Sequence, residues 1–273
     1  MENLKRLYIF TGKGGVGKST LSLSFVQSLS SNNAKYVYFK SSSLNKKEEI
    51  SDPLIAQAKE LGIPTLGLDL EQAAQSYISK KLKSQTLGKW VLKTPFFKAL
   101  INMIPGFNYL IYLGQILELL NDDPSLTLVL DSPSSGHALT MLEATHNFKD
   151  IFQSGVVFED TKKMIDLMFG DNFLKVNIIT LPTLMAVNEA QELDESLQKI
   201  TKIDTEIICN NCFKNIPNIE KSTLPEFLIN KIDNEQQVSD SFSDILDTYI
   251  PHIPTNTTHK LLKELVPSMK NLV

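Results

Sequence analysis

A glycine-rich segment directly after the first apolar run constrains this chain more than any other feature. Residues 12–20 read GKGGVGKST and satisfy the pattern G-x-x-x-x-G-K-S/T. They follow the apolar run LYIFT, and Leu21, Phe25 and Leu29 after them share one helical face. Glycines let successive backbone N–H groups face an anion, and a helix N-terminus adds a favourable dipole. The segment therefore predicts a phosphate-binding loop between a strand and a helix.

The side chains of this loop indicate how it would hold a nucleotide. Lys18 is expected to reach the β- and γ-phosphates, and the Ser19 hydroxyl to ligate Mg²⁺. The same glycines fit the dinucleotide pattern G-x-G-x-x-G, but that loop needs no lysine at position 18. We therefore expect ATP or ADP to be bound by the loop residues Gly14, Gly15, Val16, Gly17, Lys18, Ser19 and Thr20.

A second polar segment follows an apolar run later in the chain. Residues 126–130, LTLVL, end in Asp131 and are followed by SPSSGH. A carboxylate at such a strand end can hold the water shell of Mg²⁺, and Gly136 can bring its backbone N–H against a γ-phosphate. The alternative is that Asp131 only caps a helix or a turn.

Short β-rich runs alternate with helical periodicity along the whole chain. Further runs lie at residues 36–39, 176–181 and 206–209. This alternation predicts an α/β fold with a doubly wound, mostly parallel sheet. We expect residues 1–273 to form a single nucleotide-binding domain, with a helical subdomain built from inserts at about 52–122 and 140–172.

Composition excludes several classes of partner and site. The 27 Lys+Arg and 31 Asp+Glu residues give a net charge of −4, which predicts no nucleic-acid partner. Residues 99–117 carry no charge, but Pro105-Gly106 interrupt them, so we expect buried helices and no stable membrane insertion. The only cysteines, Cys209 and Cys212, fit a reducing, cytoplasmic setting. No second ligand pair accompanies them, which argues against a zinc or redox site.

Two motifs resemble those of a known family. The form K-G-G-x-G-K-S of residues 13–19 resembles the deviant phosphate loop of the MinD/ParA/nitrogenase-reductase/ArsA class, and LVLDSPSSGHALTMLEA resembles the ArsA/GET family of arsenite-pump and tail-anchored-protein targeting ATPases. This resemblance implies that Lys13 crosses a dimer interface to the partner's nucleotide and acts with Lys18 in catalysis. It also implies that Asn210, in IICNNCF, and Pro254, in the final proline-containing loop, contact the adenine nucleotide.

The chain departs from the family after the strand at residues 36–39. The family carries an aspartate there that orients the attacking water, whereas this chain continues Lys40-Ser41-Ser42. No carboxylate occurs between Glu2 and Glu48. Either Ser41 or Ser42 takes the aspartate's place, and a substitute carboxylate would have to come from Glu48 or Asp52. The sequence therefore supports nucleotide binding better than hydrolysis.

Three functions remain open from the sequence. The first is an ATP-switched homodimer, or heterodimer with a paralogue, that handles a hydrophobic protein client. Flexible apolar side chains in the helical inserts support a client, although they also suit a core: Phe96, Phe97, Met103, Phe107, Ile111, Tyr112, Met164, Met168 and Phe169. The second is a non-hydrolysing regulatory or scaffold subunit. The third is a ParA/MinD-like positioning ATPase, which needs a basic DNA face or a C-terminal membrane helix. Pro267 interrupts the C-terminal helical segment, so we expect that segment to pack on the domain.

Overall fold

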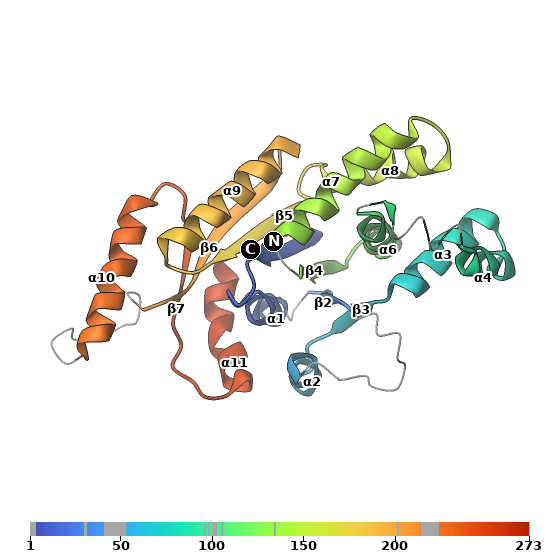
Figure 1. Cartoon of the computed structure of the whole chain (residues 1–273). Coiled ribbons are helices and arrows are strands. Elements are labelled where there is room, and N and C mark those ends of the chain that lie inside the picture. Colours follow the sequence, from blue (N-terminus) through green and yellow to red (C-terminus); the bar gives the residue numbers. More distant parts are fainter. Residues whose placement is uncertain are drawn as a thin grey trace.

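A seven-stranded sheet with all neighbouring strands parallel forms the centre of the molecule (Figure 1). The computed structural model describes residues 4–29, 32–40, 53–95, 97, 99, 103–104, 106–133, 135–200, 202–213 and 224–272. The strand order is β3-β2-β4-β1-β5-β6-β7. The strands are β1 Leu7–Gly12, β2 Ala34–Phe39, β3 Thr65–Leu68, β4 Thr127–Asp131, β5 Leu174–Thr180, β6 Asp204–Cys212 and β7 Thr248–Pro251.

The strand order confirms the α/β, doubly wound fold predicted from the sequence. From β1 at the centre the chain winds to one side through β2 and β3, returns with β4, and then winds to the other side through β5, β6 and β7. The carboxyl ends of β1 and β4 lie next to each other, with Phe10 in register with Asp131. Ligands of such sheets bind at the carboxyl ends of the strands where the winding direction changes.

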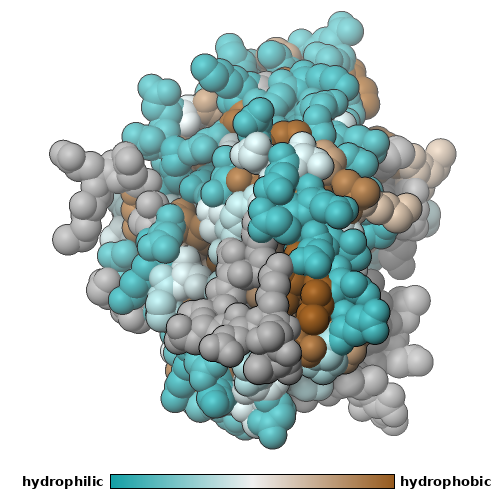
Figure 2. Space-filling model, turned by 90° about the vertical axis from the view of Figure 1, so that its left-hand side faces the viewer, coloured by the Kyte–Doolittle hydropathy of each residue, from teal (hydrophilic) through white to brown (hydrophobic). Residues whose placement is uncertain are grey.

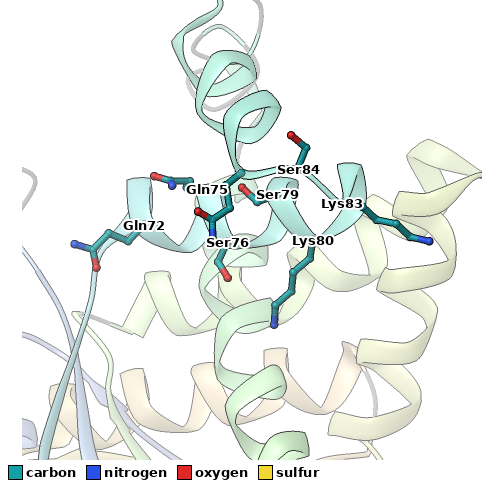
Figure 3. A pocket seen from close by; sticks show the side chains of 8 residues that line it. Gln72, Gln75, Ser76, Ser79, Lys80, Lys83 and Ser84 are labelled. Atoms are coloured by element: carbon teal, nitrogen blue, oxygen red, sulfur yellow. The ribbon is translucent and has the colours of Figure 1, made fainter.

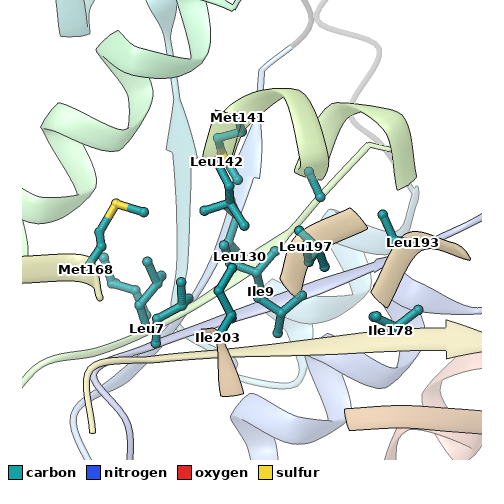
Figure 4. Close-up of a cluster of buried hydrophobic side chains, with 14 of the residues drawn as sticks. Leu7, Ile9, Leu130, Met141, Leu142, Met168, Ile178, Leu193, Leu197 and Ile203 are labelled. Atoms are coloured by element: carbon teal, nitrogen blue, oxygen red, sulfur yellow. The ribbon is translucent and has the colours of Figure 1, made fainter. Parts of the chain in front are cut away.

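Helices cover both faces of the sheet (Figure 1). One apolar core joins the sheet to α1 Lys18–Ser28, α2 Pro53–Glu60 and α11 Thr258–Met269. The other core joins it to α6 Phe107–Asp122, α7 Ser135–Phe152, α8 Val156–Met168, α9 Leu184–Ile200 and α10 Glu226–Ser241. Figure 4 shows this second core, where Leu7, Ile9 and Leu130 of the strands meet side chains of α7 and α9.

Two further helices extend the molecule beyond the β3 edge. Helix α3, Leu70–Leu82, packs on α6 and on α4, Gln85–Lys93. A small separate cluster of Ala73, Ala74, Phe97 and Ile111 holds these helices together. The boundaries predicted for a helical subdomain, about 52–122 and 140–172, stay a prediction, although α2 and β3 within the first range belong to the sheet region.

Two strands were not found in the sequence, and one helix differs from expectation. Strands β3 and β7 have four residues each and lie at the two edges of the sheet, so they give only a short apolar pattern. Pro267 lies inside α11 rather than ending it, and the helix continues for two more residues to Met269. Leu262, Leu265 and Met269 of α11 are buried against the domain. Within the described residues, no helix is both long and apolar enough to cross a bilayer.

Candidate nucleotide-binding site

The loop between β1 and α1 is shaped by three glycines with left-handed backbone angles. Gly12 has φ 137°, and a Cβ there would lie 2.2 Å from the backbone oxygen of Ile179 in β5. Gly15 has φ 84°, and Gly17, the N-cap of α1, has φ 95°. A side chain at Gly17 would also meet the Asn210 amide at 2.4 Å. These glycines are therefore required by the protein's own packing and backbone conformation.

Two other glycines have no such reason inside the protein. A Cβ built at Gly14 or Gly136 meets no described atom within 4 Å, and neither residue has a left-handed φ. Both positions are exposed and open to solvent. Glycine at an open position of this kind lets a ligand approach the backbone closely. This space fits the phosphates predicted to bind between the loop and the start of α7.

The start of α1 offers unsatisfied donors to an anion. No side chain caps the helix, and its first turn contains no acidic residue. Lys18 is only 7% exposed, and its Nζ donates to the Lys13 carbonyl at 2.9 Å. Burial lowers the pKa of Lys18, whereas the nearby Asp131 carboxylate raises it. A buried ammonium group beside free backbone donors favours the binding of a phosphate.

Ser19 and Asp131 meet where α1 begins and β4 ends. The Ser19 hydroxyl donates to Asp131 Oδ2 at 2.5 Å, and the Tyr36 hydroxyl of β2 donates to the same oxygen at 2.7 Å. Asp131 Oδ2 therefore lies at the start of α1, next to the loop. Among the described residues no cluster of three His, Cys, Asp or Glu side chains could hold a metal. A hydroxyl and one carboxylate nevertheless suit Mg²⁺, which commonly binds to one or two protein groups plus phosphates and water.

Lys13 lies at the outer side of the loop. Its Nζ forms an ion pair with Glu189 of α9 at 2.6 Å, and both side chains are partly exposed. A cavity of about 350 Å³ lies beside this pair, lined among others by Gly12, Gly136 and Thr180. The crossing of Lys13 to a partner's nucleotide stays a prediction.

The end of β6 brings Asn210 to the loop. The Asn210 amide donates to the Val16 carbonyl at 2.8 Å. The next residue, Asn211, has φ 63°, and its Oδ1 lies 2.6 Å from His252 Nδ1. Pro254, two residues further, is exposed. The structure thus brings Asn210 to the phosphate loop and the segment with Pro254 to the end of the same strand.

An aromatic stack beside Asn211 was not anticipated. The rings of Phe213 and His252 stack with centroids 4.2 Å apart, and Lys231 Nζ lies 3.9 Å from the Phe213 ring centroid. Burial lowers the pKa of His252, Lys231 lowers it further, and Glu235 raises it. The cysteines on either side, Cys209 and Cys212, are buried free thiols.

Several residues of this region carry no signal in the sequence. Tyr36 and Glu189 contact Asp131 and Lys13 from segments 95 and 176 residues away. Alternation along β2 places Tyr36 and Tyr38 on the same face of the sheet and cannot tell which of them reaches Asp131. An acid on an amphipathic helix is usually a solvated residue. The contact between Tyr109 of α6 and His137 could likewise not be predicted from the sequence. Only the three-dimensional arrangement identifies these partners.

The residues predicted to decide hydrolysis lie outside the described part of the chain. Ser41, Ser42, Glu48 and Asp52 all fall within residues 41–52. The choice between a serine and a substitute carboxylate at the aspartate position therefore stays a prediction.

Comparison with known proteins yields one family. Residues 5–233 match the family described as "Anion-transporting ATPase". Over 227 residues the chain is 24% identical to "ATPase BagA" of Mycobacterium tuberculosis and equally to "Putative ATPase Mb3704" of Mycobacterium bovis. These matches cover 78% of this chain and 66% of each relative, so the chain spans slightly less than two thirds of the relatives' length.

Proposed function

The chain belongs to the anion-transporting ATPase family, and from that premise we propose that it binds Mg-ATP and acts as an ATP-switched dimer on a protein client. One observation carries the nucleotide proposal. The Ser19 hydroxyl and the Asp131 carboxylate, 112 residues apart in sequence, meet at 2.5 Å directly below the phosphate loop. A hydroxyl at the start of α1 and a carboxylate at the end of the adjacent strand β4 are the pair of groups that Mg-nucleotide binding requires.

The proposed roles follow from the contacts of each group. When the nucleotide binds, Lys18 Nζ donates to phosphate oxygens instead of the Lys13 carbonyl. The backbone N–H groups of residues 14–20 also donate to the phosphates. Ser19 holds Mg²⁺ directly and Asp131 through water, with Tyr36 fixing the orientation of that carboxylate. A bound Mg²⁺ would neutralise charge on the phosphate oxygens. Gly136 gives the terminal phosphate access to the start of α7.

The proposed adenine end lies on the other side of the loop. Asn210 is held against Val16 by its amide nitrogen, which leaves its carbonyl oxygen oriented away from that bond. The adenine amino group is a donor that such an oxygen can accept. Pro254 contributes an exposed, rigid apolar surface nearby. A nucleotide bound in this way would span from β4 to β6.

Dimerisation is proposed through the face that carries Lys13. Leu184 and Met185 in the first turn of α9 are 58% and 71% exposed, one turn before Glu189. Apolar residues exposed beside a partly exposed ion pair are typical of a protein interface. In the dimer, Lys13 would leave Glu189 and reach the partner's nucleotide.

The apolar residues named for a protein client divide between the core and the surface. Of the apolar residues named for it, Phe97, Ile111, Tyr112 and Met168 are buried, which favours a core role, whereas Met103 is 78% exposed. A non-hydrolysing nucleotide-bound subunit is the second candidate. The absence of any acid between Glu2 and Glu48 in the sequence favours it.

The test is phosphate release from Mg-ATP by the purified protein, compared with Lys18→Ala. Turnover that Lys18→Ala abolishes would support an ATPase cycle with a substitute for the missing aspartate. If the wild type binds Mg-ATP without turnover, the nucleotide-held subunit or one half of a heterodimer is favoured. Light scattering with and without ATP then tests the dimer, with Lys13→Ala as the variant expected to stay monomeric.

A further inference from the structure

The region around α3 and α4 has a charge opposite to that of the whole chain. Residues 72–117 contain six lysines and no aspartate or glutamate, a net charge of +6, whereas the chain as a whole has −4. Three of these lysines, Lys83, Lys89 and Lys93, lie at the end of α3 and along α4. Five of the six lysines therefore belong to α3, its C-cap and α4, the helices that extend beyond β3. Figure 1 shows where these helices lie.

Two of the other lysines are already neutralised by the protein. Lys80 forms an ion pair with Glu118 of α6, and Lys81 with Asp160 of α8. Within the described ranges, no carboxylate pairs with Lys83, Lys89 or Lys93. These three cations remain available to an external partner.

Large apolar side chains accompany these cations on the outer side of α4. Trp90 is 66% exposed and Leu87 is 51% exposed. The opposite side of the helix, with Val91 and Leu92, packs on the small cluster of α3 and α6. At 100° per residue, Trp90 lies between Leu87 on one side and Lys93 and Lys89 on the other side around the helix. The outer face of α4 thus combines tryptophan, leucine and lysine, as helices that lie in a membrane interface do.

The close packing of α4 on α3 presents this face rigidly. A Cβ at Gly88 would lie 2.1 Å from Ser79 Oγ, so only glycine lets the two helices approach so closely. The cavity of about 470 Å³ at the base of α4 is lined by glutamine, serine and lysine side chains. Figure 3 shows these polar groups spread along α3 where α4 leaves it. Trp90 does not line this cavity, whose polar side chains do not favour a hydrophobic peptide.

We propose that the outer face of α4, with Lys83, Lys89 and Lys93, docks reversibly on an anionic lipid surface. A broad, negatively charged surface matches a helix face that carries cations beside the exposed Leu87 and Trp90. The lysine stems and Trp90 suit the headgroup region. The opposite end of the molecule, at α10, presents a mostly hydrophilic face (Figure 2). Docking through α4 therefore orients the molecule with one end toward the lipid.

Trp90 is the only tryptophan of the chain, so its fluorescence reports on α4 alone. We expect vesicles with about 30% phosphatidylglycerol to shift its emission to shorter wavelength and to co-sediment the protein. Vesicles of phosphatidylcholine alone should do neither, and high salt should release the protein because the cations are exposed.

Matched variants separate this surface from general charge effects. The triple variant Lys83→Gln, Lys89→Gln, Lys93→Gln should lower the affinity for anionic vesicles about 100-fold, because each lysine near such a surface contributes roughly five-fold. The control triple Lys199→Gln, Lys202→Gln, Lys263→Gln removes equal charge from exposed lysines elsewhere and should bind nearly like the wild type. Leu87→Ala should weaken binding by less than the lysine triple.

Three outcomes would overturn the proposal. The first is no emission shift and no co-sedimentation with anionic vesicles. The second is equal binding to neutral vesicles, or equal loss in both triple variants. The third is an emission shift produced by a soluble apolar helical peptide and not by vesicles, which would make α4 a site for a protein segment instead.

Discussion

The phosphate loop and the α3–α4 extension, at the centre and the edge of the molecule, are built on different principles. The loop lies between two large cores, and backbone conformation and glycine contacts define its shape. The extension rests on four buried residues, and its outward face consists of side chains free to contact something else. The chemistry of the loop thus depends on consecutive residues, whereas the chemistry of the extension depends on which helix face points outward.

Substitution of two glycines of the loop is expected to separate packing from ligand binding, with the largest loss of stability at Gly12. Gly12→Ala would put a Cβ 2.2 Å from a backbone oxygen of β5 at a left-handed φ, so we expect the free energy of unfolding to fall by about 3 kcal/mol in urea denaturation. A Cβ at Gly14 has open space around it. Gly14→Ala should therefore change the free energy of unfolding by less than about 0.5 kcal/mol, but it should weaken ATP binding. Similar losses of stability in both would contradict the distinction between packing and ligand glycines.

The extension offers the matching test at Gly88. Alanine there meets Ser79 Oγ at 2.1 Å, so we expect a loss of about 2 kcal/mol despite alanine's better helix propensity. Hydrogen exchange should rise within residues 70–93 while ATP affinity stays unchanged. Adding Ser79→Gly should restore most of the protection. A fall in ATP affinity would mean that the two regions are coupled.

Much of the central site could be predicted from the sequence because its chemistry lies in continuous motifs. Lys18, Ser19 and Asp131 occupy strand and helix ends, and the structure brings them together as a parallel sheet requires. The contacts of Tyr36 with Asp131 and of Glu189 with Lys13 could not be predicted, since they depend on how strands and helices are placed in three dimensions. The edge strands β3 and β7 were missed because four residues give little periodicity. The exposed face of α4 could not be predicted either, because the apolar residues of this helix also suit a buried core.

A smaller effect is expected at Tyr36, which no motif identified. Tyr36→Phe removes the hydroxyl that donates to Asp131, and we expect the free energy of unfolding to fall by about 1.5 kcal/mol. Tyr38→Phe in the same strand is the control and should cost about 0.5 kcal/mol or less. Thermal denaturation of the two variants measures this, and equal stabilities would show that the Asp131 bond contributes little.

The smallest expected effect is a pH dependence from the stack at β6. Burial and Lys231 lower the pKa of His252 in the folded protein, so the unfolded chain binds more protons below about pH 6.5. The free energy of unfolding should therefore decrease as pH falls through about 6.5, and level off below the folded pKa. His252→Gln should flatten this part of the profile in urea titrations between pH 5 and 8. An unchanged slope would assign the dependence to other groups.

The most direct test of the central claim is equilibrium titration of the protein with Mg-ATP, comparing wild type with Lys18→Ala. Lys59→Ala, an exposed lysine of α2, serves as the control for charge alone. The account predicts saturable binding to the wild type and control, and about 100-fold weaker binding to Lys18→Ala, because a buried ammonium–phosphate contact is lost. Equal ATP affinity in all three proteins, with folding intact by circular dichroism, would contradict the assignment of the site.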